Sequence, residues 1–116
     1  MGIVQESYTA AECAVGVNLA EGKPWQRSSR RRRVVRMGFS GSNALGDGCK
    51  ISLYYGTEKV ATLLSQVAHG GTVVGKEAFY WHTSKLICGR GVPINVMVEV
   101  AAATDPVYLQ LDIQEL

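Results

Sequence analysis

Hydrophobic and polar residues alternate along the C-terminal third of the chain. In residues 94–100, isoleucine and valine alternate with asparagine, methionine and glutamate, and the same period returns in residues 107–113. Successive side chains of an extended backbone point to opposite sides, so a period of two predicts two β-strands. The sequence Thr-Asp-Pro at residues 104–106 predicts the turn between them.

Further segments upstream also have the character of strands. Every odd position of residues 49–55 is apolar, which predicts a third strand. Residues 72–88 are rich in β-branched and aromatic side chains and favour one or two strands, and residues 13–20 form another candidate. In residues 34–39, a further strand places apolar side chains on one face. These side chains are Val35, Met37 and Phe39.

Residues 57–69 fit two structures. The spacing of their apolar residues fits a helix that is capped by Thr57 and ends at Gly70. The same stretch fits the second strand of a hairpin that turns at Gly56 and Thr57. The hairpin is the preferred interpretation, and the helix stays open as the alternative.

The pattern as a whole predicts an all-β protein with at most one short helix. A chain of 116 residues forms one domain. About eight short strands are typical of a β-sandwich, here a jelly-roll-like one. The single domain, residues 1–116, carries an N-terminal arm at about 1–12 and a basic loop at about 23–36. No apolar run reaches the roughly 20 residues that a membrane-spanning helix needs, and no membrane partner is expected.

Charge is distributed unevenly along the chain. The formal net charge is only +2, yet residues 23–36 contain Lys23, six arginines and no acid. Such clustered like charges repel one another unless an anionic partner or solvent compensates them. We therefore expect this segment to contact a partner, with Trp25 as an apolar anchor. The predicted partner-binding residues are Trp25, Arg27, Arg30, Arg31, Arg32, Arg33 and Arg36.

Two kinds of anionic partner fit these arginines. The rest of the chain is acidic, and guanidinium groups pair with carboxylates in two-pronged hydrogen bonds, so a neighbouring copy of the chain is the first candidate. Phosphates of a nucleic acid are the alternative, and binding would then weaken steeply with salt. A solvated basic loop without a partner is the plain interpretation.

The cysteines and histidines predict no metal site and no cofactor. Cys13, Cys49 and Cys88 lie in or beside apolar stretches and lack the paired spacing of zinc ligands, so we expect small buried side chains. His69 and His82 stand apart from each other and from any cysteine pair.

No catalytic signature is strong enough to predict an enzyme. Residues 70–77 match the spacing of a phosphate-binding loop, but Glu77 occupies the position of the magnesium-binding hydroxyl. His82 and Ser84 lack a fixed acidic partner. A small enzyme or a sugar-binding protein that uses Tyr80, Trp81 and His82 is the weakest of the hypotheses.

The polar opening segment, the many short strands and the ending GVPINVMVEVAAATDPVYLQLDIQEL form a recognisable pattern. Over residues 34–116 it resembles small jelly-roll-like β-sandwich proteins of virus particles, including capsid and capsid-decorating proteins of tailed phages. The resemblance implies self-assembly and docking on a shell, without catalytic residues.

The expected function is therefore that of a structural virion protein. It would assemble into a viral capsid, or decorate one, through contacts with other copies of itself and with a capsid protein. The first residues lack the features of a secretory signal, so we expect synthesis in the host cytoplasm. A small nucleic-acid-binding module that uses the arginine-rich loop is the alternative function.

Overall fold

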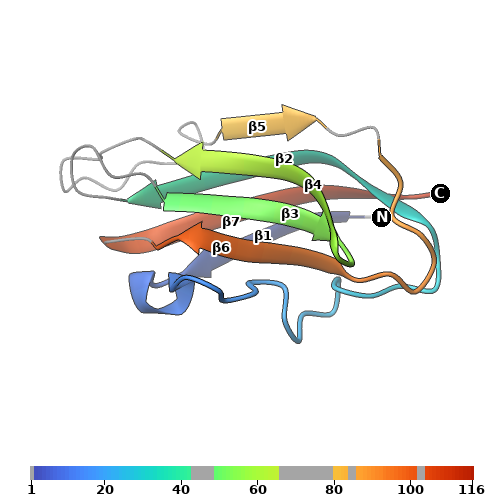
Figure 1. Ribbon diagram of the computed structural model, residues 1–116. Coiled ribbons are helices and arrows are strands. Elements are labelled where there is room, and N and C mark those ends of the chain that lie inside the picture. Colours follow the sequence, from blue (N-terminus) through green and yellow to red (C-terminus); the bar gives the residue numbers. More distant parts are fainter. Residues whose placement is uncertain (1, 43–48, 66–79, 84–85, 102–103) are drawn as a thin grey trace.

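The described residues of the protein form two antiparallel β-sheets and one short 3-10 helix (Figure 1). The computed structural model describes residues 2–42, 49–65, 80–83, 86–101 and 104–116. The elements are β1 (Gly2–Tyr8), η1 (Ala10–Cys13), β2 (Arg32–Ser42), β3 (Cys49–Tyr55), β4 (Glu58–Ser65), β5 (Tyr80–Thr83), β6 (Ile94–Val100) and β7 (Thr104–Glu115).

The two sheets form two layers with the core between them. The first sheet has the order β1-β7-β2-β5, and the second has the order β4-β3-β6. One buried cluster joins side chains of both sheets. The layers are also connected by a hydrogen bond of 3.0 Å, which the Val34 amide of β2 donates to the Tyr55 hydroxyl of β3. The predicted all-β class is confirmed.

The apolar positions that alternate along the C-terminal third are the positions buried in the core. Ile94, Val96 and Val98 of β6 are buried, and so are the four apolar side chains at odd positions of β7, from Val107 to Ile113. The predicted turn is wrong in position, because residues 104–106 begin β7, where Thr104 pairs with Ser42.

Residues 58–65 form a strand and not a helix. β3 and β4 pair from Cys49 with Ser65 to Tyr55 with Glu58. The turn between them contains Gly56 at φ 64°, a conformation that costs glycine little. A Cβ at this position would also lie 3.2 Å from the Val92 side chain. The preferred hairpin is confirmed for these residues, while 66–69 lie outside the described part.

A β-bulge in β2 corrects the predicted face of that strand. The pairing with β7 shifts between Val34 and Arg36, so Val35 is an extra residue in the ladder. Val34 and Met37 are therefore buried, and Val35 is only half-buried. Arg36 points to the outer face, where a regular strand would have turned it toward the core.

Residues 13–20 do not form the predicted strand. Cys13 ends η1, which Thr9 and Glu12 cap reciprocally through side-chain and backbone hydrogen bonds. The chain then runs along β6, with backbone bonds of 2.9 Å from Gly16 to Val98 and 2.8 Å from Leu19 to Val96. Residues 2–8, predicted as part of an N-terminal arm, are β1 and pair with β7 along their whole length. No helix in the described residues is long and apolar enough to span a membrane.

Shortening a core side chain tests the two-layer packing. Leu111 is fully buried in the central strand β7, so Leu111→Ala is expected to lower the free energy of unfolding by about 2–5 kcal/mol. Urea denaturation followed by far-UV circular dichroism measures the change. The matched control is Ile3→Ala, because Ile3 is 65% exposed and its truncation should cost less than about 0.5 kcal/mol. Equal costs for both variants would contradict this packing.

Candidate interaction surface

Arg32 lies inside the protein, although it belongs to the arginine run. Its side chain is 3% exposed. The guanidinium group donates hydrogen bonds to the carbonyl oxygens of Trp25 at 2.5 Å, Gln26 at 3.1 Å and Val92 at 3.3 Å. Arg32 is thus a structural residue, and its predicted role in partner binding is wrong.

These bonds join two segments that are distant in sequence. Trp25 and Gln26 precede β2, whereas Val92 precedes β6. The backbones of Arg32 and Cys88 also pair in both directions, at 3.0 and 2.7 Å. Burial raises the pKa of the Cys88 thiol, and the nearby Arg32 guanidinium lowers it by less. The segment before β2 is therefore fixed against the segment before β6.

Three other arginines of the run have partners within the chain. Arg36 binds Asp112 with N–O distances of 2.9 and 3.0 Å on the outer face of the first sheet. Arg33 donates to the Gln114 side chain at 2.6 Å. Arg30, which is largely exposed, lies 3.7 Å from Glu115. Because β2 pairs with β7, the charges of the run meet acceptors of the C-terminal strand.

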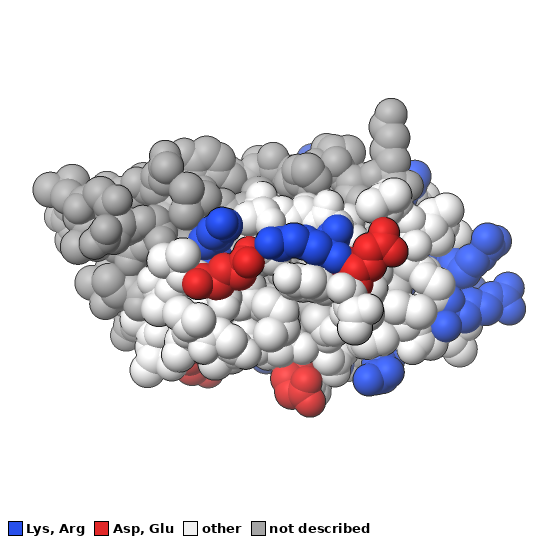
Figure 2. Space-filling model, viewed as in Figure 1, with Lys and Arg blue, Asp and Glu red and all other residues white. Residues whose placement is uncertain are grey.

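The remaining arginines form an exposed group at one end of the molecule. Arg27 and Arg31 are exposed, and in the described part of the chain neither makes an ion pair. A third residue, Arg90, lies beside them because the Gly91 amide donates a 2.8 Å hydrogen bond to the Ser28 carbonyl. Arg30, whose ion pair with Glu115 is largely exposed, lies in the same loop. Figure 2 shows blue side chains gathered at this end. We define the basic end as Arg27, Arg30, Arg31 and Arg90.

Arg90 was not among the predicted residues. It stands alone in the sequence between Gly89 and Gly91, so no charge run marks it. Two long-range backbone contacts bring it beside the arginine run, the bridge between Arg32 and Cys88 and the hydrogen bond from Gly91 to Ser28. A sequence signal was present only in the Gly-Arg-Gly turn itself, where Gly91 has φ 72°.

Trp25 is the partly buried anchor of the loop, as its predicted packing role requires. It packs against the core cluster, while its indole Nε1 is enclosed without a hydrogen-bond acceptor. Its side chain lines a cleft of about 310 Å³ together with Arg27 and the first residues of β1. Trp25 therefore connects the loop of the basic end to the hydrophobic core.

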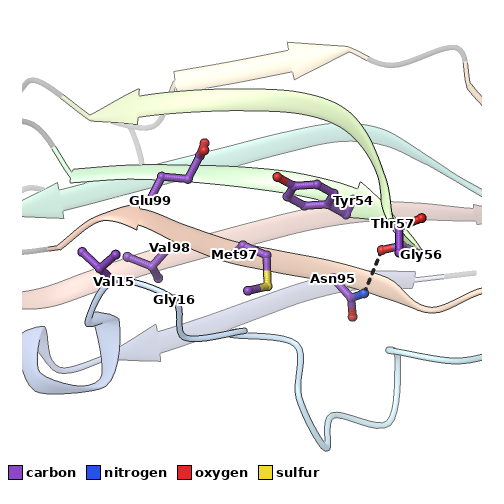
Figure 3. Close-up of a pocket in the computed structure, with 9 residues that line it drawn as sticks. All are labelled: Val15, Gly16, Tyr54, Gly56, Thr57, Asn95, Met97, Val98 and Glu99. Atoms are coloured by element: carbon purple, nitrogen blue, oxygen red, sulfur yellow. Dashed lines mark hydrogen bonds between the residues drawn. The ribbon is translucent and has the colours of Figure 1, made fainter.

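A second candidate is a groove on the outer face of the second sheet (Figure 3). It has a volume of about 570 Å³ and lies between β6, the β3–β4 hairpin and the segment before β2. Its floor includes Met97 and Tyr54, and Val15 at its border is 67% exposed. Glu99 also lines the groove. Its carboxylate accepts hydrogen bonds from Ser52 and Lys59, which hold the pKa of Glu99 below its usual range. No set of polar groups converges on one point there, so the groove favours apolar contact over chemistry.

The described residues contain no grouping of three or more His, Cys, Asp and Glu side chains that could hold a metal ion. Cys13 and Cys88 are buried, as predicted, and neither forms a disulfide within the described residues. The phosphate-loop spacing at 70–77 lies outside the described residues, and Tyr80, Trp81 and His82 are described only as backbone of β5.

Comparisons with protein-family models, curated protein sequences and solved structures find no match to this chain. Inference about function therefore depends on the strand arrangement and on the surfaces just described.

Replacing Arg32 tests its structural role. Arg32→Met removes the donors to three carbonyl oxygens and is expected to lower the free energy of unfolding by about 1–3 kcal/mol. Urea denaturation measures this, with the neighbouring Arg31→Met as the matched control. Arg31 is exposed, so its replacement should change stability by less than about 0.5 kcal/mol. If the two variants were equally stable, Arg32 would not hold the loops together.

Proposed function

We propose that the protein is a structural component of a virus particle, a jelly-roll-like β-sandwich that builds or decorates the shell. It acts through contacts with other copies of itself and with a capsid protein, without turnover. Synthesis in the host cytoplasm and residence in the virion follow from this role.

The observation that carries the proposal is the pairing of the strands. Residues 16–19 are not a strand, but they follow β6 through three backbone hydrogen bonds and the isolated bridge between Asn18 and Met97. With this segment in the place of a strand, the described residues contain eight extended elements in chain order, of which the first pairs with the last (β1 with β7) and the second with the seventh (residues 16–19 with β6). The third pairs with the sixth (β2 with β5), and the fourth with the fifth (β3 with β4).

This nested pairing is what a long antiparallel hairpin produces when it folds over into two facing sheets. It supports a jelly roll, an architecture that recurs in viral capsid proteins. A fold alone does not establish a function, so the surfaces supply the second support. The basic end offers exposed guanidinium groups, and large apolar side chains lie exposed elsewhere. The latter are Ile3, Val15, Val17, Leu86, Ile87, Val100 and Leu116.

The genes that flank the reading frame test the virion role without any assumption about the interface. A shell protein is expected beside genes for capsid, portal or terminase proteins. Sequencing of the source genome gives the answer directly. A setting among metabolic or regulatory genes, with no virion gene nearby, would contradict the proposal.

Nucleic-acid binding is the alternative, favoured by the three arginines Arg27, Arg31 and Arg90 that are exposed and without ion pairs among the described residues. Three phosphate contacts predict a log–log slope of affinity against salt of about −3 on duplex DNA. A filter-binding titration across salt measures the slope, with Lys50→Gln on the second sheet as the control for nonspecific charge. A slope near −3 that flattens in Arg31→Gln but not in the control would favour this alternative over the shell protein.

A further inference from the structure

The basic end has a counterpart of opposite charge elsewhere on the molecule. A groove of about 410 Å³ lies between the end of β1, η1 and the following segment. We define it as the acidic groove. Its lining residues are Tyr8, Ala11, Glu12, Val17, Asn18, Leu19, Glu21 and Lys23.

The groove carries a net negative charge. Glu12 and Glu21 are both exposed, and no lysine or arginine forms an ion pair with either in the described residues. The one cation in the lining, Lys23, is paired with Glu6 at 3.4 Å and lies 5.5 Å from the centre of the Tyr8 ring. Two carboxylates thus remain uncompensated, beside apolar side chains.

The behaviour of Tyr8 is consistent with this charge. Its hydroxyl donates to the Leu19 carbonyl at 3.0 Å. Burial raises the pKa of the Tyr8 phenol strongly, and the carboxylates of Glu6 and Glu12 add to the shift because they repel a phenolate. The smaller, carboxylate part of the shift reflects the negative charge beside Tyr8.

The basic end and the η1 side of the acidic groove lie toward opposite ends of an elongated molecule, while the groove continues along the segment after η1. The extents of the protein are 42 × 26 × 20 Å. In Figure 1, η1 lies at the left and the loop before β6, which carries Arg90, lies at the right. A contact between the basic end of one copy and the acidic groove of the next is consequently heterologous, with different surfaces on the two sides.

We propose that copies of this chain associate head to tail, with the basic end of one copy docked into the acidic groove of the next. Heterologous contacts of this kind close into rings or continue as filaments, which suits a shell subunit. The inference rests on the proposed function, because it specifies the contact between copies which that function requires. It is tested separately, by association of the protein in solution.

Lateral pairing through the free edge of β1 is the competing contact between copies, and the structure disfavours it. Glu6 lies on the side of β1 that carries the buried Tyr8, and its ion pair with Lys23 holds two charges at this edge. Charged side chains placed in this way are a common protection of edge strands against pairing. Charge complementarity, by contrast, directs the basic end to the groove.

Charge reversal on each side, followed by mixing, tests the contact. The end variant is Arg31→Glu with Arg90→Glu, and the groove variant is Glu21→Lys. Glu12 is left intact because its carboxylate caps η1. The controls are Lys50→Glu and Glu58→Lys on the second sheet, and circular dichroism checks that every variant is folded. Sedimentation velocity at low salt measures association over a wide range of concentration.

The wild-type chain and both controls are expected to associate, more weakly at high salt. The end and groove variants alone should each associate about tenfold more weakly, because an attraction becomes a repulsion. Their equimolar mixture should recover association, since the reversed end then meets the reversed groove. A monomeric wild type, variants that associate like the wild type, or a mixture that does not recover would each overturn the inference. Any of these results would reject the head-to-tail contact but not the virion role, which the neighbouring genes test separately.

Discussion

The hydrogen bonds of one buried guanidinium group determine the shape of the candidate interaction surface. Arg32 binds three carbonyl oxygens from two segments, one before β2 and one before β6. Burial of a cation is costly, and these bonds from the two Nη groups offset part of that cost, while the enclosed Nε has no hydrogen-bond acceptor among the described residues. Because of these bonds, the loop that carries Arg27 and Arg31 is not an independent basic tail. It is held against the turn that carries Arg90, and the exposed charges keep a fixed relative position.

The β-sheets divide the arginine run into parts with different roles. Arg32 and Val34 point inward, and the bulge at Val35 then returns Arg36 to the outer face, where Asp112 binds it. The pairing of β2 with β7 brings Gln114 and Glu115 to Arg33 and Arg30. The charge that the sequence concentrates in one segment is thus partly neutralised inside the chain. The basic end is the part of this charge that remains available to a partner. In the proposed contact, the acidic groove of another copy attracts it through opposite charge.

The sequence predicted the elements that follow from local periodicity and missed those that follow from pairing. Alternation located β6 and β7, because each has one face in the core and one outside. It could not locate the bulge, since one inserted residue at Val35 leaves the composition of the strand unchanged. Residues 13–20 are mostly apolar but lie at the border of a sheet. They contact β6 through backbone hydrogen bonds, which a pattern of side chains does not reveal.

The candidate site was predictable only in part for the same reason. Clustering of charge identified Arg27, Arg30 and Arg31, which the structure leaves exposed, but it also included Arg32, which is buried. Nothing local distinguishes four consecutive arginines from one another. Burial of one of them, and the approach of Arg90 from a distant turn, are consequences of tertiary pairing across more than fifty positions, as the bridge between Arg32 and Cys88 makes plain.

The most direct test of the central claim is side-chain hydrogen exchange of the arginines, followed by NMR on arginine-labelled protein. The claim is that Arg32 is enclosed and bonded whereas Arg31, its neighbour in sequence, is free in solvent. The Nη–H groups of Arg32, which donate the three hydrogen bonds, are expected to exchange much more slowly than the Nη–H groups of Arg31. Exchange of the Nη–H groups of both residues at the same rate as in free arginine would contradict the claim.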